Sequence, residues 1–135
     1  MASAGVWLRA IPEAEAALKP GPEKWSKKEI LGHLIDSAAN NHQRFVRAQL
    51  QDELTFPKYE QEGWARCQDY ASADWSLLIE LWSAYNRHLA WVIERIPPAK
   101  LAMPVQIVGY EPCTLGFLVE DYVVHLDHHL GQLRR

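Results

Sequence analysis

The sequence has 135 residues, of which 48% are hydrophobic and 23% are charged, and its formal net charge at pH 7 is -3. This length predicts one domain, residues 1–135, with enough core to fold without disulfides or other staples. The basic residues are scattered rather than clustered on one segment, which argues against a nucleic-acid partner, and no apolar run approaches the roughly 20 residues of a membrane span.

The N-terminus and the cysteines indicate a cytoplasmic protein. Residues 1–5 lack the basic region and following apolar run of a signal peptide. Cys67 and Cys113 lie far apart without a CxxC spacing. A single disulfide between them stays open, but neither a disulfide framework nor a zinc finger is indicated. We therefore expect a protein of the reducing cytoplasm that does not associate with membranes.

The first predicted helix covers residues 6–19. Its apolar positions recur at steps of four and three, as on one face of a helix; they are Trp7, Ile11, Ala14 and Leu18. Pro12 either begins the main part of this helix or kinks it. Residues 19–22 contain two prolines and a glycine, and they end the helix.

The second predicted helix has the clearest start in the sequence. Ser26 is followed three residues later by Glu29, which is the spacing of a capping box, and the periodic pattern continues to about Leu50. The apolar face consists of Leu31, Leu34, Ala38, Phe45 and Ala48. A separate polar stripe runs beside it, formed by His33, Ser37, Asn40 and Arg44.

Two more helices complete the predicted fold. The third covers residues 74–96, where apolar positions step by three and four: Trp75, Leu78, Trp82, Tyr85, Leu89, Val92 and Ile96. Thr114 caps the last helix, which runs to the chain end. The connection 51–71 has room for one short helix, the connection 97–113 for a short extended piece at 105–110, and no sheet of useful size is predicted. The sequence thus predicts an all-α, up-down four-helix bundle with long connections.

Three of the six histidines fall within five residues near the C-terminus. At about 100° per residue, His129 lies inside the apolar arc of the last helix and His125 at its edge, whereas His128 lies outside. Residues four apart are neighbours on a helix, so His125 and His129 can reach a common ion. Imidazole suits zinc, nickel, copper and iron. His33, on the polar stripe of the second helix, is the candidate third ligand.

Simpler explanations compete with the metal site. A single histidine on a buried face is more often a hydrogen-bonded core residue. The pair four apart, taken together with a histidine on another long helix, is what makes the metal site a serious alternative. His42 lies roughly opposite His33 on its helix, and we interpret it as a surface or packing residue. We interpret His88 as structural, because it has no histidine partner at ligand spacing. The tryptophans are expected to fill the core and the walls of a pocket.

Two carboxylates lie one helical turn from the candidate ligands. Asp121 precedes the C-terminal histidine pair by one turn, and Asp36 follows His33 by about one turn. Either could accept the ring N–H of a ligand and fix its tautomer, or act as a catalytic base directly or through water. An ion pair of Asp36 with Arg44 or Arg47 is the favoured alternative. No GxSxG turn and no Gly-rich phosphate loop is present.

Two motifs resemble those of the DinB-like superfamily. Residues 25–37, Trp-Ser-Lys-Lys-Glu-Ile-Leu-Gly-His-Leu-Ile-Asp-Ser, are similar to the start of its metal-bearing helix. Residues 125–133, His-Leu-Asp-His-His-Leu-Gly-Gln-Leu, are similar to its other metal motif. Their order and helix spacing also match. The resemblance implies a four-helix bundle in which His33, His125 and His129 bind nickel or zinc, or alternatively manganese or iron.

The resemblance also bears on function. Members of this superfamily include metal-dependent hydrolases, S-transferases that use bacillithiol or mycothiol, and a maleylpyruvate isomerase, and many form homodimers. We therefore expect a divalent-metal-binding enzyme, a hydrolase or a thiol S-transferase, that acts on a small molecule and forms a homodimer. A low-molecular-weight thiol is the expected partner of a transferase. Two alternatives stay open: a non-catalytic metal or small-ligand binding module of a stress response, and a metal-free interaction bundle.

Overall fold

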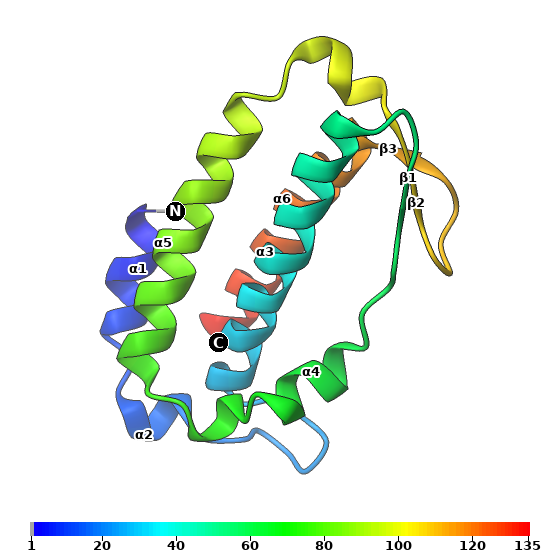
Figure 1. Ribbon diagram of the computed structural model, residues 1–135. Helices are drawn as coiled ribbons and strands as arrows, with labels where there is room; N and C mark the ends of the chain where they lie inside the picture. Colours follow the sequence, from blue (N-terminus) through cyan, green and yellow to red (C-terminus); the bar gives the residue numbers. More distant parts are fainter. Residues whose placement is uncertain (1) are drawn as a thin grey trace.

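The computed structural model describes residues 2–135 and is built mainly of helices (Figure 1). The α-helices are α1 Ala2–Arg9, α2 Glu13–Ala16, α3 Lys27–Leu50, α4 Gln61–Cys67, α5 Trp75–Glu94 and α6 Leu115–Leu133. Two 3₁₀ segments are η1 Tyr70–Ser72 and η2 Pro98–Ala102, and three short strands are β1 Leu54–Phe56, β2 Pro104–Ile107 and β3 Cys113–Thr114. The predicted four-helix bundle with long connections is confirmed.

The bundle consists of α1, α3, α5 and α6. Helix α3 packs against both α5 and α6, and α1 packs against α5. The helices alternate in direction except for α3 and α5, which run the same way (Figure 1). Their N-termini meet at Glu13, whose carboxylate pairs with Lys28 and accepts a hydrogen bond of 3.0 Å from the backbone N–H of Trp75. The long connection through β1 and α4 returns the chain to this end, which makes the parallel arrangement possible.

The start of α3 is tied to the end of α6. The capping box forms as predicted: the Ser26 side chain accepts from the backbone N–H of Glu29, and the Glu29 side chain accepts from that of Ser26. Lys27 then donates to the carbonyl of Leu133 at 2.7 Å. Because α3 and α6 are antiparallel, this contact sets their relative position, and it brings the first turns of α3 opposite the last turns of α6.

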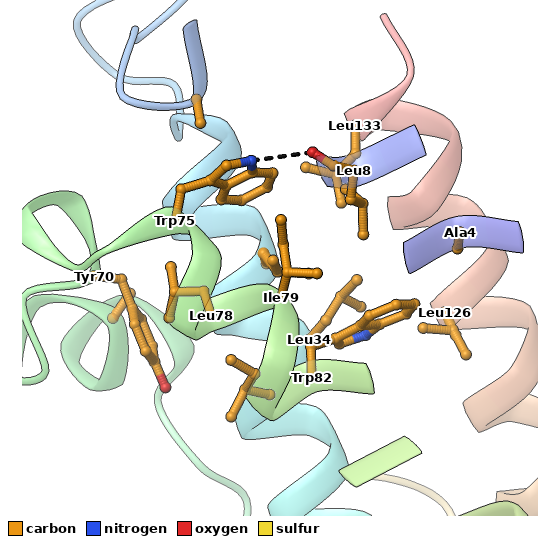
Figure 2. Packing of buried hydrophobic residues seen from close by; sticks show 14 residues of the cluster. Ala4, Leu8, Leu34, Tyr70, Trp75, Leu78, Ile79, Trp82, Leu126 and Leu133 are labelled. Atoms are coloured by element: carbon orange, nitrogen blue, oxygen red, sulfur yellow. Dashed lines mark hydrogen bonds between the residues drawn. The ribbon is translucent and has the colours of Figure 1, made fainter. Parts of the chain in front are cut away.

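Two clusters of buried hydrophobic residues fill the bundle. The first lies between α1, α3, α5 and α6, where the indole N–H of Trp75 donates to the carbonyl of Leu8 at 3.2 Å (Figure 2). Trp82 lies deeper in the same cluster and is 1% exposed. The second cluster lies toward the sheet and contains Phe45 and Tyr122. The apolar faces predicted for α3 and α5 are the ones that pack inward, which is why the bundle is predictable from periodicity.

The N-terminal segment differs from the prediction. Instead of one helix over residues 6–19 the chain forms α1 and α2, separated at residues 10–12. Pro12 has an extended backbone, φ −63° and ψ 146°, and stands at the N-cap of α2. Of the predicted apolar face, Trp7 and Ile11 are partly buried against the first cluster, but Ala14 is exposed and Leu18 is 67% exposed. The fully buried hydrophobic residues of this segment are Ala4, Leu8 and Ala16. The break resets the helical phase, so a period read across it fails.

A small sheet joins the two long connections. The extended piece predicted at residues 105–110 overlaps β2, but its pairing with the other two strands was not predicted. Strand β1 pairs in parallel with β2, with Leu54 opposite Val105, and β2 pairs antiparallel with β3, with Val105 opposite Cys113. Strands of two to four residues are too short to show an alternating pattern, and β1 and β2 are far apart in sequence. Within residues 2–135 no helix has both the length and the apolar character of a membrane span.

Candidate metal centre

Three histidines from two helices converge near one end of the bundle. His33 comes from α3, and His125 and His129 come from α6. One ring nitrogen from each lies within 4.8 Å of the others. The Nε2 atoms of His33 and His125 are 3.1 Å apart. The structure therefore brings together the three residues that the helix geometry and the family resemblance selected.

The three rings form a compact aromatic cluster. Their centroids are 4.5 Å apart for His125 and His129, 4.8 Å for His33 and His129, and 5.0 Å for His33 and His125. The indole of Trp25 lies against His33, with a centroid distance of 5.1 Å. His33 is only 2% exposed, whereas the other two are half-buried. The packing restricts how each ring can rotate, and so orients the nitrogens toward one another.

Burial keeps these histidines neutral. It lowers the pKa of His33 from 6.5 to about 3, helped by the neighbouring His125 and His129. Burial, with a further contribution from His129, lowers the pKa of His125 to about 4. The pKa of His129 is lowered too, again mainly by burial. Neutral imidazole is the form that coordinates a metal, so the cluster is in the required protonation state at neutral pH.

One ring of the cluster is oriented by a residue that the sequence reasoning did not single out. The Nδ1 atom of His129 lies 2.8 Å from the side-chain oxygen of Gln132. An amide oxygen only accepts, so Nδ1 carries the proton and Nε2 keeps a free lone pair. By contrast, the Nδ1 atoms of His33 and His125 are buried without a hydrogen-bond partner among the described residues.

The two carboxylates take different places. The side chain of Asp36 is 3% exposed and accepts hydrogen bonds from the Tyr70 hydroxyl at 2.7 Å and from the Gln68 amide at 2.9 Å. Burial raises its pKa. It forms no ion pair with an arginine and no bond to a histidine ring in the part of the chain that is described. The ion pair and the bond to a histidine ring offered for Asp36 are therefore replaced by its bonds to Tyr70 and Gln68.

Asp121 is exposed and lines the same cavity as His125, which follows it by one turn on α6. Its negative charge acts to raise the pKa of His125, against the larger effect of burial. The hydrogen bond that Asp121 could accept from a ring N–H is not formed, since the Nδ1 atom of His125 has no partner among residues 2–135. Asp121 is thus free to face the contents of the cavity.

The other histidines lie outside the cluster. His42 lies 3.0 Å from the Tyr85 hydroxyl through Nδ1, and His88 packs edge-on against His42. This agrees with the packing and structural roles expected of them. His128 is exposed and lies 3.2 Å from the Gln132 amide nitrogen. The helical phase predicted for α6 therefore separates His128 from His129 correctly.

A cavity of about 530 Å³ extends from the histidines toward the sheet. His33 and His125 stand in its wall, and from α3 the wall continues through Ser37, Asn41 and Arg44. The predicted polar stripe held Asn40 instead of Asn41, but the Asn40 side chain is buried against the carbonyl of Asp36. Across the cavity, the opposite wall comes from the connections and α6, with Lys58, Tyr59, Ile107, Tyr110, Cys113 and Phe117. Its volume is that of a small-molecule site.

The donor set fits a divalent metal ion. Two nitrogen ligands of a tetrahedral ion, each about 2.0–2.1 Å from it, lie roughly 3.3 Å apart. The Nε2 atoms of His33 and His125 are already 3.1 Å apart. All three donors are imidazoles, which suit ions such as zinc and nickel. The three ring nitrogens could hold an ion with coordination positions left over for water or substrate.

Comparisons with known proteins identify the family of the chain. The family model of the DinB superfamily matches residues 5–133. A protein of Halalkalibacterium halodurans named "Putative metal-dependent hydrolase" is 19% identical over 126 residues, which cover 93% of this chain and 73% of the other.

A solved structure, described as "YfiT from Bacillus subtilis is a probable metal-dependent hydrolase with an unusual four-helix bundle topology", matches with a TM-score of 0.86. It is 18% identical, and the match covers 98% of this chain and 78% of that one. At this identity the likeness concerns the fold. The family model, in contrast, spans nearly all of the described residues, and the chain belongs to the DinB superfamily.

Proposed function

We propose that the protein is a metal-dependent hydrolase of a small molecule, with one divalent ion bound by His33, His125 and His129. One observation carries the proposal: three neutral imidazoles converge within 4.8 Å, and two of them, His33 and His125, line a cavity. The names of the two relatives, which both describe metal-dependent hydrolases, support the reaction class. Because the donors are all nitrogen, zinc and nickel suit the site better than manganese, which prefers oxygen ligands, and iron is the next candidate.

The chain's own residues define how such a reaction would run. The ion would supply Lewis-acid activation of a water nucleophile at neutral pH. His33 and His125 face the cavity, so a substrate in the cavity lies on the open side of the site. We assign the role of general base to Asp121, which lines the cavity one turn from His125. The water oxygen would bond to the electrophilic carbon while a water proton passes to Asp121. The bond between that carbon and the leaving group would then break, and the leaving group would take the proton from Asp121.

Asp36 has a different proposed role. Its carboxylate is buried and bonded to Tyr70 and Gln68, and none of these three residues lines the cavity. We therefore propose that Asp36 stabilises the contact between α3 and η1 and does not exchange protons with a substrate. The homodimer, the cytoplasmic location and a thiol cosubstrate stay predictions of the sequence.

Metal analysis of protein purified without a histidine tag tests the proposal. We expect about one zinc or nickel per chain in the native protein and a large loss in His33→Ala, because two histidines alone bind weakly. His42→Ala is the matched control: it lies on the same helix and bonds to Tyr85 outside the cluster. Equal metal content in all three proteins would remove the proposed site.

A second measurement separates an enzyme from a non-catalytic binding module. Hydrolysis of a panel of small esters and amides should require the metal, stop on chelation and return when zinc or nickel is added back. Asp121→Asn should keep the metal and lose most of the turnover, about 100-fold or more, since general-base catalysis contributes on that order. A protein that binds metal with full occupancy and hydrolyses nothing in the panel would favour the binding module.

A further inference from the structure

A second feature of the cavity is a guanidinium at the end away from the histidines. Arg44 lies eleven residues after His33 on α3, and both side chains line the same cavity. At about 1.5 Å per residue their Cα atoms are roughly 16 Å apart along the helix axis. Because long side chains on a helix lean toward its N-terminus, the guanidinium stands closer to the histidines than its Cα does.

Within residues 2–135 the Arg44 guanidinium has no anionic partner. No carboxylate oxygen of the described chain lies within 4.0 Å of it, and its Nε atom is buried without a hydrogen-bond acceptor. The guanidinium makes a cation–π contact with the Phe56 ring, with its Cζ atom 5.3 Å from the ring centroid. Burial also lowers its pKa. A half-buried charge without a counter-ion costs free energy, and an anionic ligand at this position would offset part of that cost.

A second cation stands at the same end of the cavity. Lys58 also lines it and lies 5.4 Å from the centroid of the Tyr110 ring, again with no carboxylate within 4.0 Å in the described chain. Three carboxylates line the cavity as well. Glu60 is used to cap α4, where it accepts from the backbone N–H of Gly63, while Glu111 and Asp121 are exposed. None of these four side chains, Arg44, Lys58, Glu111 and Asp121, forms an ion pair in the described chain, and only Arg44 among them is half-buried. Asp121 acts on Arg44 from beyond ion-pair distance, raising its pKa.

We propose that Arg44 binds a carboxylate of the substrate, so that the enzyme acts on a small carboxylate-bearing molecule whose scissile bond lies at the histidines. The inference rests on the proposed function and adds the substrate class to it. A guanidinium presents two parallel N–H groups to a carboxylate, which fixes orientation as well as adding affinity. Held at one end by Arg44, an elongated substrate would place its other end beside His33 and His125.

Binding of a carboxylate at Arg44 can be tested in the metal-free protein by comparing a carboxylate ligand with the matched amide. In metal-free protein, hexanoate should shift the ¹⁵N resonance of the Arg44 side chain, whereas hexanamide should not. The Arg47 side chain serves as the internal control, because it is exposed on the same helix and bonds to Gln43. Equal shifts at Arg44 and Arg47, or no shift at Arg44, would overturn the assignment of Arg44.

Hydroxamic acids that end in a carboxylate test the spacing in zinc-loaded protein. Titration calorimetry would compare a series of increasing chain length with matched compounds that end in an amide. At the best length we expect the carboxylate compound to bind about 10- to 100-fold tighter, the usual range for a hydrogen bond to a charged group. Arg44→Gln should remove this difference, Arg44→Lys should keep part of it, and Arg47→Gln should leave it unchanged.

The outcomes separate the two proposals. If the carboxylate compounds have no advantage at any length, or keep it in Arg44→Gln, the substrate class is wrong while the metal site stands. If the protein holds no zinc but hexanoate still shifts Arg44, the metal-dependent function is wrong and Arg44 remains an anion site. Arg44→Gln should melt no earlier than the native protein, because it removes an unpaired charge. A lower melting temperature would instead assign Arg44 a structural role.

Discussion

The Nδ1 atom of His129 lies 2.8 Å from the side-chain oxygen of Gln132, its neighbour one turn later on α6. This bond holds the proton on Nδ1 and leaves Nε2 free for an ion. Gln132→Leu should therefore weaken metal binding about 10- to 100-fold, as is usual when a residue that orients a ligand is lost. Gln132→Glu should retain the affinity, because a carboxylate accepts the same proton. Competition with a chromophoric chelator measures both variants, and equal affinities for Gln132→Leu and the native protein would contradict the assigned tautomer.

The adjacent pair of histidines on α6 allows a test that depends on helical phase alone. His129 belongs to the cluster, whereas His128 is exposed. His129→Ala should leave two ligands and much weaker metal binding, and His128→Ala should keep nearly full metal content. Bound metal per chain after identical dialysis gives the comparison. Loss of metal in His128→Ala with retention in His129→Ala would sink the assignment of the site.

Acid should destabilise the metal-free protein through the buried histidines. Each is neutral in the folded state, with a pKa of about 3 for His33 and about 4 for His125, whereas in the unfolded chain both titrate near 6.5. The unfolded state therefore binds more protons below pH 6.5. The free energy of unfolding should fall as the pH drops from 6.5, by up to about 1.4 kcal/mol per pH unit for each group. The fall should level off below the folded-state pKa values.

Urea unfolding at a series of pH values measures this, with His33→Gln as the comparison. The variant should show a smaller fall between pH 6.5 and 4, since one of the groups that takes up a proton on unfolding is gone. His128→Gln, whose side chain is exposed, should follow the native protein. A native curve that is flat across this range would show that the folded histidines titrate normally.

Two glycines offer a matched pair for packing. A Cβ at Gly32 would lie 2.2 Å from a ring carbon of Tyr70, whereas at Gly131 it would meet no heavy atom within 4 Å outside its own helix. Gly32→Ala should therefore destabilise the protein by about 1–3 kcal/mol through overpacking. Gly131→Ala should stabilise it by up to about 1 kcal/mol through helix propensity. Thermal unfolding measures both.

A rescue experiment follows from the same contact. Combining Gly32→Ala with Tyr70→Leu should recover part of the loss, because the smaller side chain makes room for the methyl group. The recovery should be incomplete, since Tyr70 also donates to the buried Asp36. Additive effects of the two substitutions would show that Gly32 and Tyr70 are not coupled in the way that the packing implies.

The helices, and the inward direction of His125 and His129, could be predicted from the sequence for one physical reason. Periodicity and capping are local, so the start of α3 at Ser26 and the phase of His125 and His129 on α6 follow from residues within a few turns. The same locality explains the errors. The break at Pro12 shifts the phase of the first helix. The extended piece at 105–110 was predicted locally, but its pairing with β1 was not, because the two strands are distant in sequence.

By itself, the sequence determined an all-α bundle, the inward direction of His125 and His129, and the exposure of His128. Only the tertiary structure decided that His33 meets them, because that depends on the antiparallel packing of α3 on α6 and its contact between Lys27 and Leu133. The partners of the polar groups were decided there as well. Asp36 bonds to Tyr70 and Gln68, and Arg44 has no carboxylate partner among the described residues, because η1, α4 and the sheet bring distant segments against α3.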